Sequence, residues 1–189
     1  MRVFVALVLP DTLRHELVEA TSGLCASRND LRWISAARLH LTIAFLGDLD
    51  DRGTDIAVEA AERSAADARP FLLACSGLIA MPRRGAARVL AASIGKGSAE
   101  ATALADGFEE ALADLGREAA YAVRPREDRP FTAHVTLARA ARATVKFSED
   151  ELEPLAAASG EVSALAVYES LLGSGEAKYR ELARRELGK

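Results

Sequence analysis

His40-Leu41-Thr42-Ile43-Ala44 and His134-Val135-Thr136-Leu137-Ala138 are two copies of one pattern, about half the chain length apart: histidine, apolar, threonine, apolar, alanine. In a β-strand, residues i and i+2 lie on the same face. Each copy therefore predicts a strand that presents an imidazole beside a hydroxyl and buries its two apolar side chains on the other face. The repetition indicates two related lobes that each contribute one such strand to a shared cleft.

Two histidines that face each other across a cleft can act as an acid–base pair. Histidine titrates at a pKa of about 6.5, so both protonation states are present near neutral pH. A neutral imidazole can take a proton from an attacking water while an imidazolium gives one to the leaving oxygen. The hydroxyls of Thr42 and Thr136 can donate hydrogen bonds to non-bridging phosphate oxygens. We therefore predict that His40 and His134 catalyse the opening of a strained cyclic phosphodiester.

Arg139 and His15 are two further residues that could take part in this reaction. Arg139 could add charge-assisted hydrogen bonds to the same phosphate. In an ideal strand it falls on the face opposite His134, so it would reach the cleft only past a bend or bulge. His15 has no repeated context and lies between Arg14 and Glu16 in a predicted helix. We interpret it as a surface residue.

Other reaction types fit the sequence poorly. The chain has no His-x-His or Cys-x-x-Cys spacing, so we predict neither a metal nor another cofactor. Gly95-Lys96-Gly97-Ser98 lacks the first glycine of a phosphate loop and predicts a turn before a helix. Gly173-Ser174-Gly175 lacks the spacing of a nucleophile elbow.

The composition predicts a folded, soluble protein. Of 189 residues, 50% are hydrophobic and 28% are charged, and no apolar run approaches the length of a membrane span. The net charge of −4 argues against a broad nucleic-acid-binding surface, so any RNA contact must be local. We expect a cytoplasmic monomer, with Cys25 and Cys75 as core residues. The basic residues form two groups in the sequence: Arg83, Arg84 and Arg88, and then Arg124, Arg126, Arg129, Arg139, Arg142 and Lys146.

Interleaved strand and helix patterns favour an α+β fold with antiparallel sheets. Strands are predicted at 2–9, 39–46, 71–80, 88–94, 133–138 and 162–172. Helices are predicted from an Asp11 N-cap to about residue 26, at 53–68, from 98 to a stop at Gly116, weakly at 149–158, and by composition at 178–187.

These motifs resemble the two-histidine phosphoesterases, and within them the bacterial RNA 2′,3′-cyclic phosphodiesterases once called 2′-5′ RNA ligases. The similarity spans essentially the whole chain. Its signature consists of Arg32-Trp33, the run from Leu39 to Gly47, the run from Phe131 to Arg139, the run from Val167 to Leu172, and Tyr179. One departure is Ala133, where many relatives carry proline.

The resemblance implies a single bilobal domain over residues 1–189, with two pseudo-symmetric lobes, each an antiparallel sheet flanked by helices, and a metal-independent cleft between them. It implies cleavage of RNA 2′,3′-cyclic phosphate ends to a 2′-phosphate. His40 would be the general acid and His134 the general base, although the two motifs are nearly interchangeable by sequence. The positions of Phe45 and Arg139 match family residues at the substrate site. It also implies a C-terminal strand where composition predicts a helix.

Three alternatives remain open from the sequence. The same site could run the reverse reaction and ligate RNA through a 2′-5′ bond. The substrate could be a small nucleotide such as ADP-ribose 1″,2″-cyclic phosphate. The protein could also be a non-catalytic module that binds RNA ends.

Overall fold

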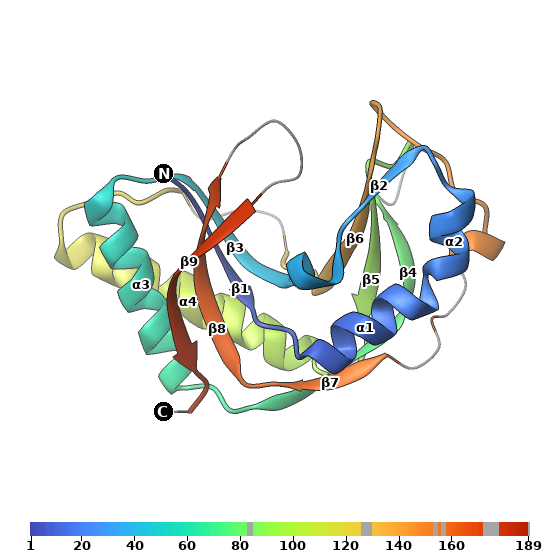
Figure 1. Ribbon diagram of the computed structural model, residues 1–189. Helices are drawn as coiled ribbons and strands as arrows, with labels where there is room; N and C mark the ends of the chain where they lie inside the picture. Colours follow the sequence, from blue (N-terminus) through green and yellow to red (C-terminus); the bar gives the residue numbers. More distant parts are fainter. Residues whose placement is uncertain (83–84, 126–129, 153–154, 156–157, 172–177, 189) are drawn as a thin grey trace.

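In a computed structural model, the described residues form a strongly curled antiparallel sheet and four α-helices (Figure 1). The structure describes residues 1–82, 85–125, 130–152, 155, 158–171 and 178–188. The strands are β1 (Arg2–Leu7), β2 (Leu31–Trp33), β3 (Leu41–Asp48), β4 (Phe71–Met81), β5 (Val89–Ile94), β6 (His134–Ala140), β7 (Ser159–Val162), β8 (Ala164–Leu171) and β9 (Lys178–Glu186). The helices are α1 (Asp11–Ala20), α2 (Ser22–Ser27), α3 (Asp51–Ala66) and α4 (Ser98–Glu118), with 3-10 turns η1 (Ala36–Arg38) and η2 (Asp150–Leu152).

Eight of the nine strands in the described residues form two four-stranded halves that meet at one seam. The strand order is β7-β4-β5-β6-β3-β1-β8-β9, and β2 pairs with β6 beside the seam. Between β3 and β6 the only paired residues in the described chain are Leu41 and Val135, and the two strands then diverge (Figure 1). The predicted α+β class with antiparallel sheets in two lobes is confirmed, and the lobes are halves of one continuous sheet.

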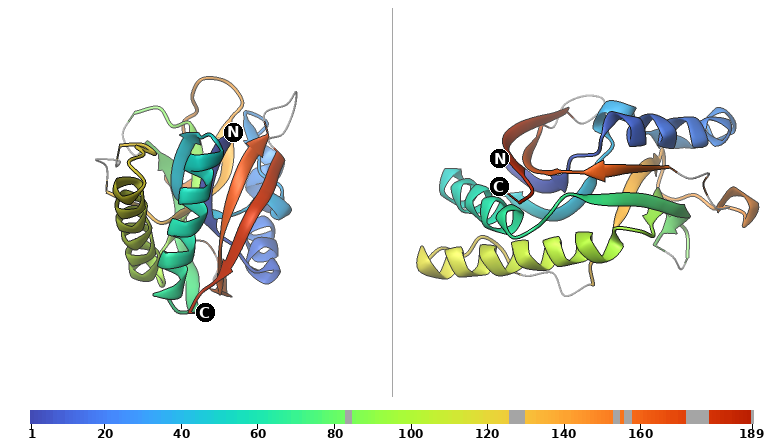
Figure 2. Two further views of the ribbon diagram at one scale, coloured as in Figure 1. Left: turned by 90° about the vertical axis from the view of Figure 1, so that its left-hand side faces the viewer. Right: turned by 90° about the horizontal axis from the view of Figure 1, so that it is seen from below.

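Helices pack against both halves of the sheet. α3 packs on β8 and β9, α4 packs on α3 and β3, and α1 packs on β7. The side view shows α3 and α4 lying next to each other, and the view from below shows α1 and α4 on opposite sides of the strands (Figure 2). These helices contribute fully buried side chains, namely Leu13 and Leu17 of α1 and Phe108 of α4. They join one apolar core that continues beneath the seam.

Several predicted helix boundaries were wrong for local reasons. Asp11 is the first residue of α1 and forms an ion pair with Arg14, while Pro10 occupies the cap position. The helix predicted to residue 26 is interrupted at Thr21, whose hydroxyl donates to the Leu17 carbonyl at 2.8 Å. Gly116 does not stop α4. Its missing side chain instead leaves room for the Tyr121 carbonyl, which would lie 2.8 Å from a Cβ at that position.

The C-terminal third departs most from the composition-based predictions. The segment 178–187 is predominantly strand, because β9 hydrogen-bonds along the length of β8, so the helix prediction was wrong and the strand implied by the family resemblance is correct. Of the weak helix at 149–158, the described residues contain only the short turn η2. Cys75 is buried, which raises the pKa of its thiol to about 11, but Cys25 is exposed and not a core residue.

Some sequence features lie outside the described residues: Arg83, Arg84, Arg126, Arg129, Leu172, and the Gly173-Ser174-Gly175 stretch. Among the helices that are described, none combines the length and hydropathy needed to cross a membrane.

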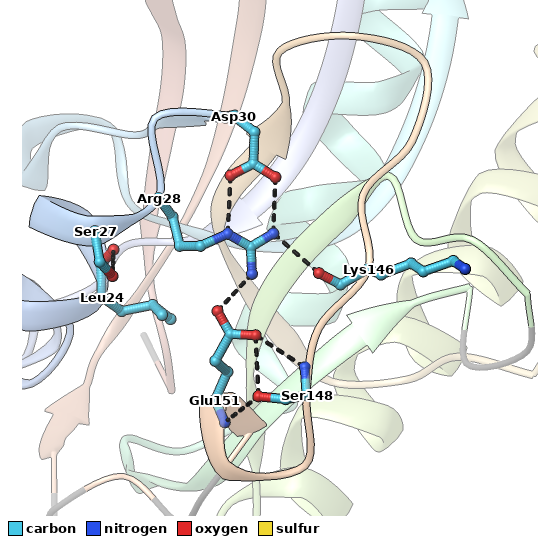
Figure 3. Close-up of polar contacts among 7 residues, drawn as sticks. All are labelled: Leu24, Ser27, Arg28, Asp30, Lys146, Ser148 and Glu151. Atoms are coloured by element: carbon cyan, nitrogen blue, oxygen red, sulfur yellow. Dashed lines mark hydrogen bonds and ion pairs between the residues drawn. The ribbon is translucent and has the colours of Figure 1, made fainter.

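An arginine-centred network fixes the start of β2 (Figure 3). Arg28 donates through Nε and Nη2 to both carboxylate oxygens of Asp30 at 2.8 Å, and through Nη1 to Glu151 at 2.6 Å. Its Nη2 also reaches the Lys146 carbonyl at 3.0 Å. Glu151 in turn accepts from the backbone N–H of Ser148 at 2.8 Å. The network therefore ties the residues before β2 to the segment that follows β6.

Two glycines of the α4 region are expected to respond oppositely to alanine substitution. Gly97 precedes the helix with φ of 86°, and a Cβ there would lie 2.6 Å from the Leu72 carbonyl oxygen. Gly97→Ala should destabilise the protein by at least about 1–2 kcal/mol, because a side chain is strained in this left-handed conformation. Gly107 lies inside α4, and nothing lies within 4 Å of a Cβ built there. Gly107→Ala should therefore stabilise the protein by about 0.5–1 kcal/mol. Urea unfolding of both variants measures this, and equal stabilities would contradict it.

Candidate active site

The register at the seam brings the two histidine–threonine motifs together. Leu41 pairs with Val135, and both side chains are fully buried. Continuing this antiparallel register by one residue on each side sets His40 beside Thr136 and Thr42 beside His134. Because residues flanking a buried position point to the opposite face, these four side chains share one face of the sheet. We call this the motif face. On it the two histidines occupy diagonal positions.

Both imidazoles are held by the same hydrogen bond. The Nδ1 of His40 lies 2.8 Å from the carbonyl of Arg38, and the Nδ1 of His134 lies 2.8 Å from the carbonyl of Thr132. A carbonyl can only accept, so Nδ1 carries the proton in each ring. The Nε2 atoms are therefore left to exchange protons with a substrate, and the ring orientations are fixed.

His40 is packed between aromatic side chains. Its ring centroid lies 5.1 Å from that of Phe4 on β1 and 5.4 Å from that of Tyr179 on β9. Burial lowers the pKa of His40 below its ordinary value of 6.5. The hydrogen bond to the Arg38 carbonyl opposes this effect, whereas the positive charge of Arg139 adds to it. In the free protein the neutral form of His40 is thus favoured at neutral pH.

A β-bulge turns Arg139 toward the motif face. The register between β5 and β6 sets Ala91 opposite Thr136 but Leu90 opposite Ala138, so Leu137 is the extra residue. A bulge of this kind reverses the side-chain alternation that follows it. Arg139 consequently points to the same side as Thr136, in agreement with the effect of its charge on the His40 pKa. The bend that the sequence argument required is present.

A cavity of about 550 Å³ opens beside the seam where β3 and β6 diverge. Thr42 and His134 line it, whereas His40 and Thr136 are not among its lining residues. Phe45 also lines the cavity; its side chain is 54% exposed and lies 6.1 Å from the Phe4 ring. The remaining lining residues include Phe131 and the ion-paired Glu109 and Arg124. The cavity thus offers apolar surface next to His134, and its charged lining residues are the Glu109–Arg124 ion pair and Asp106.

The sequence analysis did not identify Phe4 as a neighbour of His40. Phe4 alternates with Val3 and Val5 on β1 and therefore lies on the opposite face of that strand. It is nevertheless only 3% exposed, since His40 and Tyr179 cover it. The one sequence feature that could have indicated this contact is that Phe4 is the only aromatic residue in an otherwise largely aliphatic strand.

Two described members of the second basic group, Arg124 and Arg139, lie in different surroundings. Arg124 is paired with Glu109 in the cavity wall, while Arg139 lies on the motif face. In the described part of the chain, no three His, Cys, Asp or Glu side chains are grouped so that they could hold a metal ion. His15 is exposed, as predicted.

Comparison with known proteins identifies relatives over most of the chain. The family model of the 2′-5′ RNA ligase superfamily matches residues 9–173. An RNA 2′,3′-cyclic phosphodiesterase of Thermus thermophilus is 34% identical over 142 residues, which cover 74% of this chain and 68% of the relative. A protein of the same name from Geobacillus stearothermophilus is 29% identical over 82% of this chain, but the match spans only 47% of that protein.

Solved structures agree with this relationship. The crystal structure of TT0787 from Thermus thermophilus matches with a TM-score of 0.84 at 28% identity, covering 100% of this chain and 98% of that one. Escherichia coli LigT in complex with 3′-AMP matches with a TM-score of 0.77 at 24% identity over the same shares, which shows the fold. On the family match and the Thermus relative, the chain belongs to the 2′-5′ RNA ligase superfamily, the two-histidine phosphoesterases.

Proposed function

We propose that this enzyme hydrolyses RNA 2′,3′-cyclic phosphate ends to 2′-phosphates by metal-independent catalysis with His40 and His134. The observation that carries the proposal is the pair of imidazoles, each held through Nδ1 by a backbone carbonyl, on the two motifs that the Leu41–Val135 pair joins. The names of the Thermus and Geobacillus relatives support the same substrate. The substrate is therefore an RNA or nucleotide end that bears a cyclic phosphate.

The reaction needs one proton removed and one supplied. His134 takes a proton from water as its oxygen bonds to phosphorus, and His40 gives its Nε2 proton to O3′ as the P–O3′ bond breaks. Attack and departure occur on opposite sides of phosphorus, which suits two imidazoles at diagonal positions. Thr42 and Thr136 donate to the non-bridging oxygens where negative charge accumulates.

Two further residues complete the proposed substrate site. Arg139 supplies a positive charge to the phosphate from the motif face. Phe45 offers an exposed ring in the cavity beside His134, on which a nucleobase can stack.

The assignment of His40 as the acid and His134 as the base follows the family resemblance. It requires His40 to be protonated when the substrate is bound. A general acid must be protonated, yet burial lowers the pKa of His40. A bound phosphate is an anion, which favours the protonated imidazole and offsets this effect. For the free enzyme, kcat/KM should therefore fall as pH rises through the lowered pKa of His40.

Ligation is the second candidate, because the family that matches this chain is named for 2′-5′ RNA ligase activity. The reverse reaction replaces water by the 5′-hydroxyl of another RNA at the same histidines. Incubating a nicked RNA with 2′,3′-cyclic and 5′-hydroxyl ends and quantifying joined against hydrolysed product distinguishes the two activities. Excess joined product would make ligation the main reaction.

The product identifies the proposed reaction directly. An oligoribonucleotide with a 2′,3′-cyclic phosphate end, incubated with the enzyme in EDTA, should yield only the 2′-phosphate, assigned by mass spectrometry and ³¹P NMR. A 3′-phosphate would show that O2′ leaves, and a loss of turnover in EDTA would show that a metal takes part. Tight binding without turnover would favour a non-catalytic RNA-end-binding module.

Removing either motif histidine should abolish most of the activity. His40→Ala and His134→Ala should each lower kcat by about 10²–10⁴, the usual contribution of one acid–base group. The matched control is His15→Ala, since His15 is exposed in α1 and should leave kcat unchanged. Wild-type turnover by His40→Ala would rule out the two-histidine mechanism.

Titration of His40 tests its environment independently of activity. Its midpoint, followed by ¹H–¹⁵N NMR of the imidazole, should lie below 6.5 in the free protein, because burial disfavours the charged ring. Arg139→Gln removes a nearby positive charge and should raise that midpoint. Arg142→Gln, which changes an exposed arginine by the same charge, serves as the control. A midpoint that does not move in Arg139→Gln would contradict the position of Arg139 on the motif face.

A further inference from the structure

Two arginines lie opposite each other on the motif face. β2 pairs with β6 in a register that sets Arg32 directly across from Arg139. Leu31 and Trp33, which flank Arg32, pack into the core beneath the sheet, so the Arg32 side chain points to the other side. The bulge at Leu137 brings Arg139 to that same side.

This arrangement leaves positive charge uncompensated. Like charges directly opposite each other destabilise an antiparallel pair. Among the described residues, no carboxylate forms an ion pair with either arginine, and both are exposed. The one hydrogen bond from the Arg32 side chain goes to the Ala141 carbonyl at 2.8 Å. An anion bound beside the catalytic histidines would relieve this repulsion.

Arg28, four residues before Arg32, differs because two carboxylates neutralise its charge. Its guanidinium is occupied by Asp30 and Glu151 and is 13% exposed (Figure 3). This network holds the chain just before β2, so Arg32 projects from a fixed strand. Arg32 therefore has a defined position on the motif face, and no carboxylate among the described residues neutralises its charge through an ion pair.

Resting on the proposed function, we propose that Arg32 binds a second phosphate of the substrate, the one on the 5′ oxygen of the ribose that carries the cyclic phosphate. Thr136 and Arg139 pair with Ala91 and Val89, which are two residues apart on β5, so Arg139 lies roughly 7 Å along the sheet from Thr136 at about 3.3 Å per residue. Arg139 can thus reach back to the cyclic phosphate, while Arg32 lies across from Arg139 on β2, along the edge of β6 that also carries the seam. A guanidinium presents paired N–H donors that match phosphate oxygens. The enzyme should accordingly prefer an RNA end over a cyclic mononucleotide.

The test compares substrates that differ only at the second phosphate. These are adenosine 2′,3′-cyclic phosphate, the dinucleotide ApA 2′,3′-cyclic phosphate, and the same dinucleotide with an uncharged methylphosphonate linkage. Wild-type kcat/KM should be about tenfold or more higher for the charged dinucleotide than for the other two, the contribution of one charge-assisted hydrogen bond. Added salt should reduce this difference, because the contact is ionic.

Arg32→Gln should remove most of the preference and leave hydrolysis of the mononucleotide within about twofold of wild type, since no contact to the cyclic phosphate is lost. Arg32→Lys should retain part of the preference through its charge. Arg117→Gln removes an exposed charge from α4 and is the matched control, with the preference unchanged. Thermal unfolding of each variant verifies that it folds.

The outcomes separate this inference from the proposed function. If the wild type hydrolyses none of the three substrates, the proposed function fails and the inference fails with it. Equal wild-type kcat/KM for the three substrates overturns the inference alone. A preference that survives in Arg32→Gln, or an equal loss on every substrate, also overturns the assignment of Arg32 to the second phosphate.

ADP-ribose 1″,2″-cyclic phosphate also carries a phosphate at the equivalent ribose oxygen. Arg32 could therefore recognise either an RNA end or this small nucleotide. Wild-type kcat/KM for this compound and for the charged dinucleotide distinguishes them. A higher value for the dinucleotide supports an RNA end as the ligand, and a higher value for the ADP-ribose compound overturns it.

Discussion

The pairing of Leu41 with Val135 at the seam holds the candidate site together. It is the only pairing between β3 and β6 in the described residues, and both side chains are completely buried. Because alternation in a strand is strict, burying the central residue of each tripeptide forces its histidine and threonine to the other face. A slip of one residue would send the imidazoles into the core. Hydrophobic packing below the sheet therefore determines the chemistry above it.

The electrostatics of the motif face follow from this packing. His40 is enclosed by Phe4 and Tyr179, and burial disfavours its charged form. Arg139 lies near enough to disfavour it further. Among the described residues, no carboxylate forms an ion pair with Arg32 or Arg139 on the motif face, so positive charge gathers there in the absence of substrate. A bound phosphate reverses each of these effects, since an anion stabilises both the arginine and the imidazolium. The resting protein is arranged for an anion.

Irregular strand geometry is as important to the site as the regular pattern. One extra residue, Leu137, places Arg139 on the motif face, which an ideal strand would not do. The register of β1 against β3 also shifts, between Val5 and Ala6, and Phe45 beyond that shift is an exposed aromatic side chain next to the cavity. Bulges of this kind re-aim side chains near functional sites. They explain how two strands with the same short motif present different neighbours to the substrate.

The sequence alone determined the features that depend on local periodicity. These are the alternating motif strands, strands β4 and β5, helices α3 and α4, and the shared strand face of each histidine and its threonine, for which the i and i+2 spacing is sufficient. Only the tertiary structure decided the features that depend on a partner strand. Residues 178–186 have a helix-like composition, but the open edge of β8 supplies hydrogen-bond partners and makes them a strand. The direction of Arg139 is set by its register with β5, and the burial of Phe4 and His40 by contacts among three strands. Those contacts join residues distant in sequence, and no local pattern encodes their register.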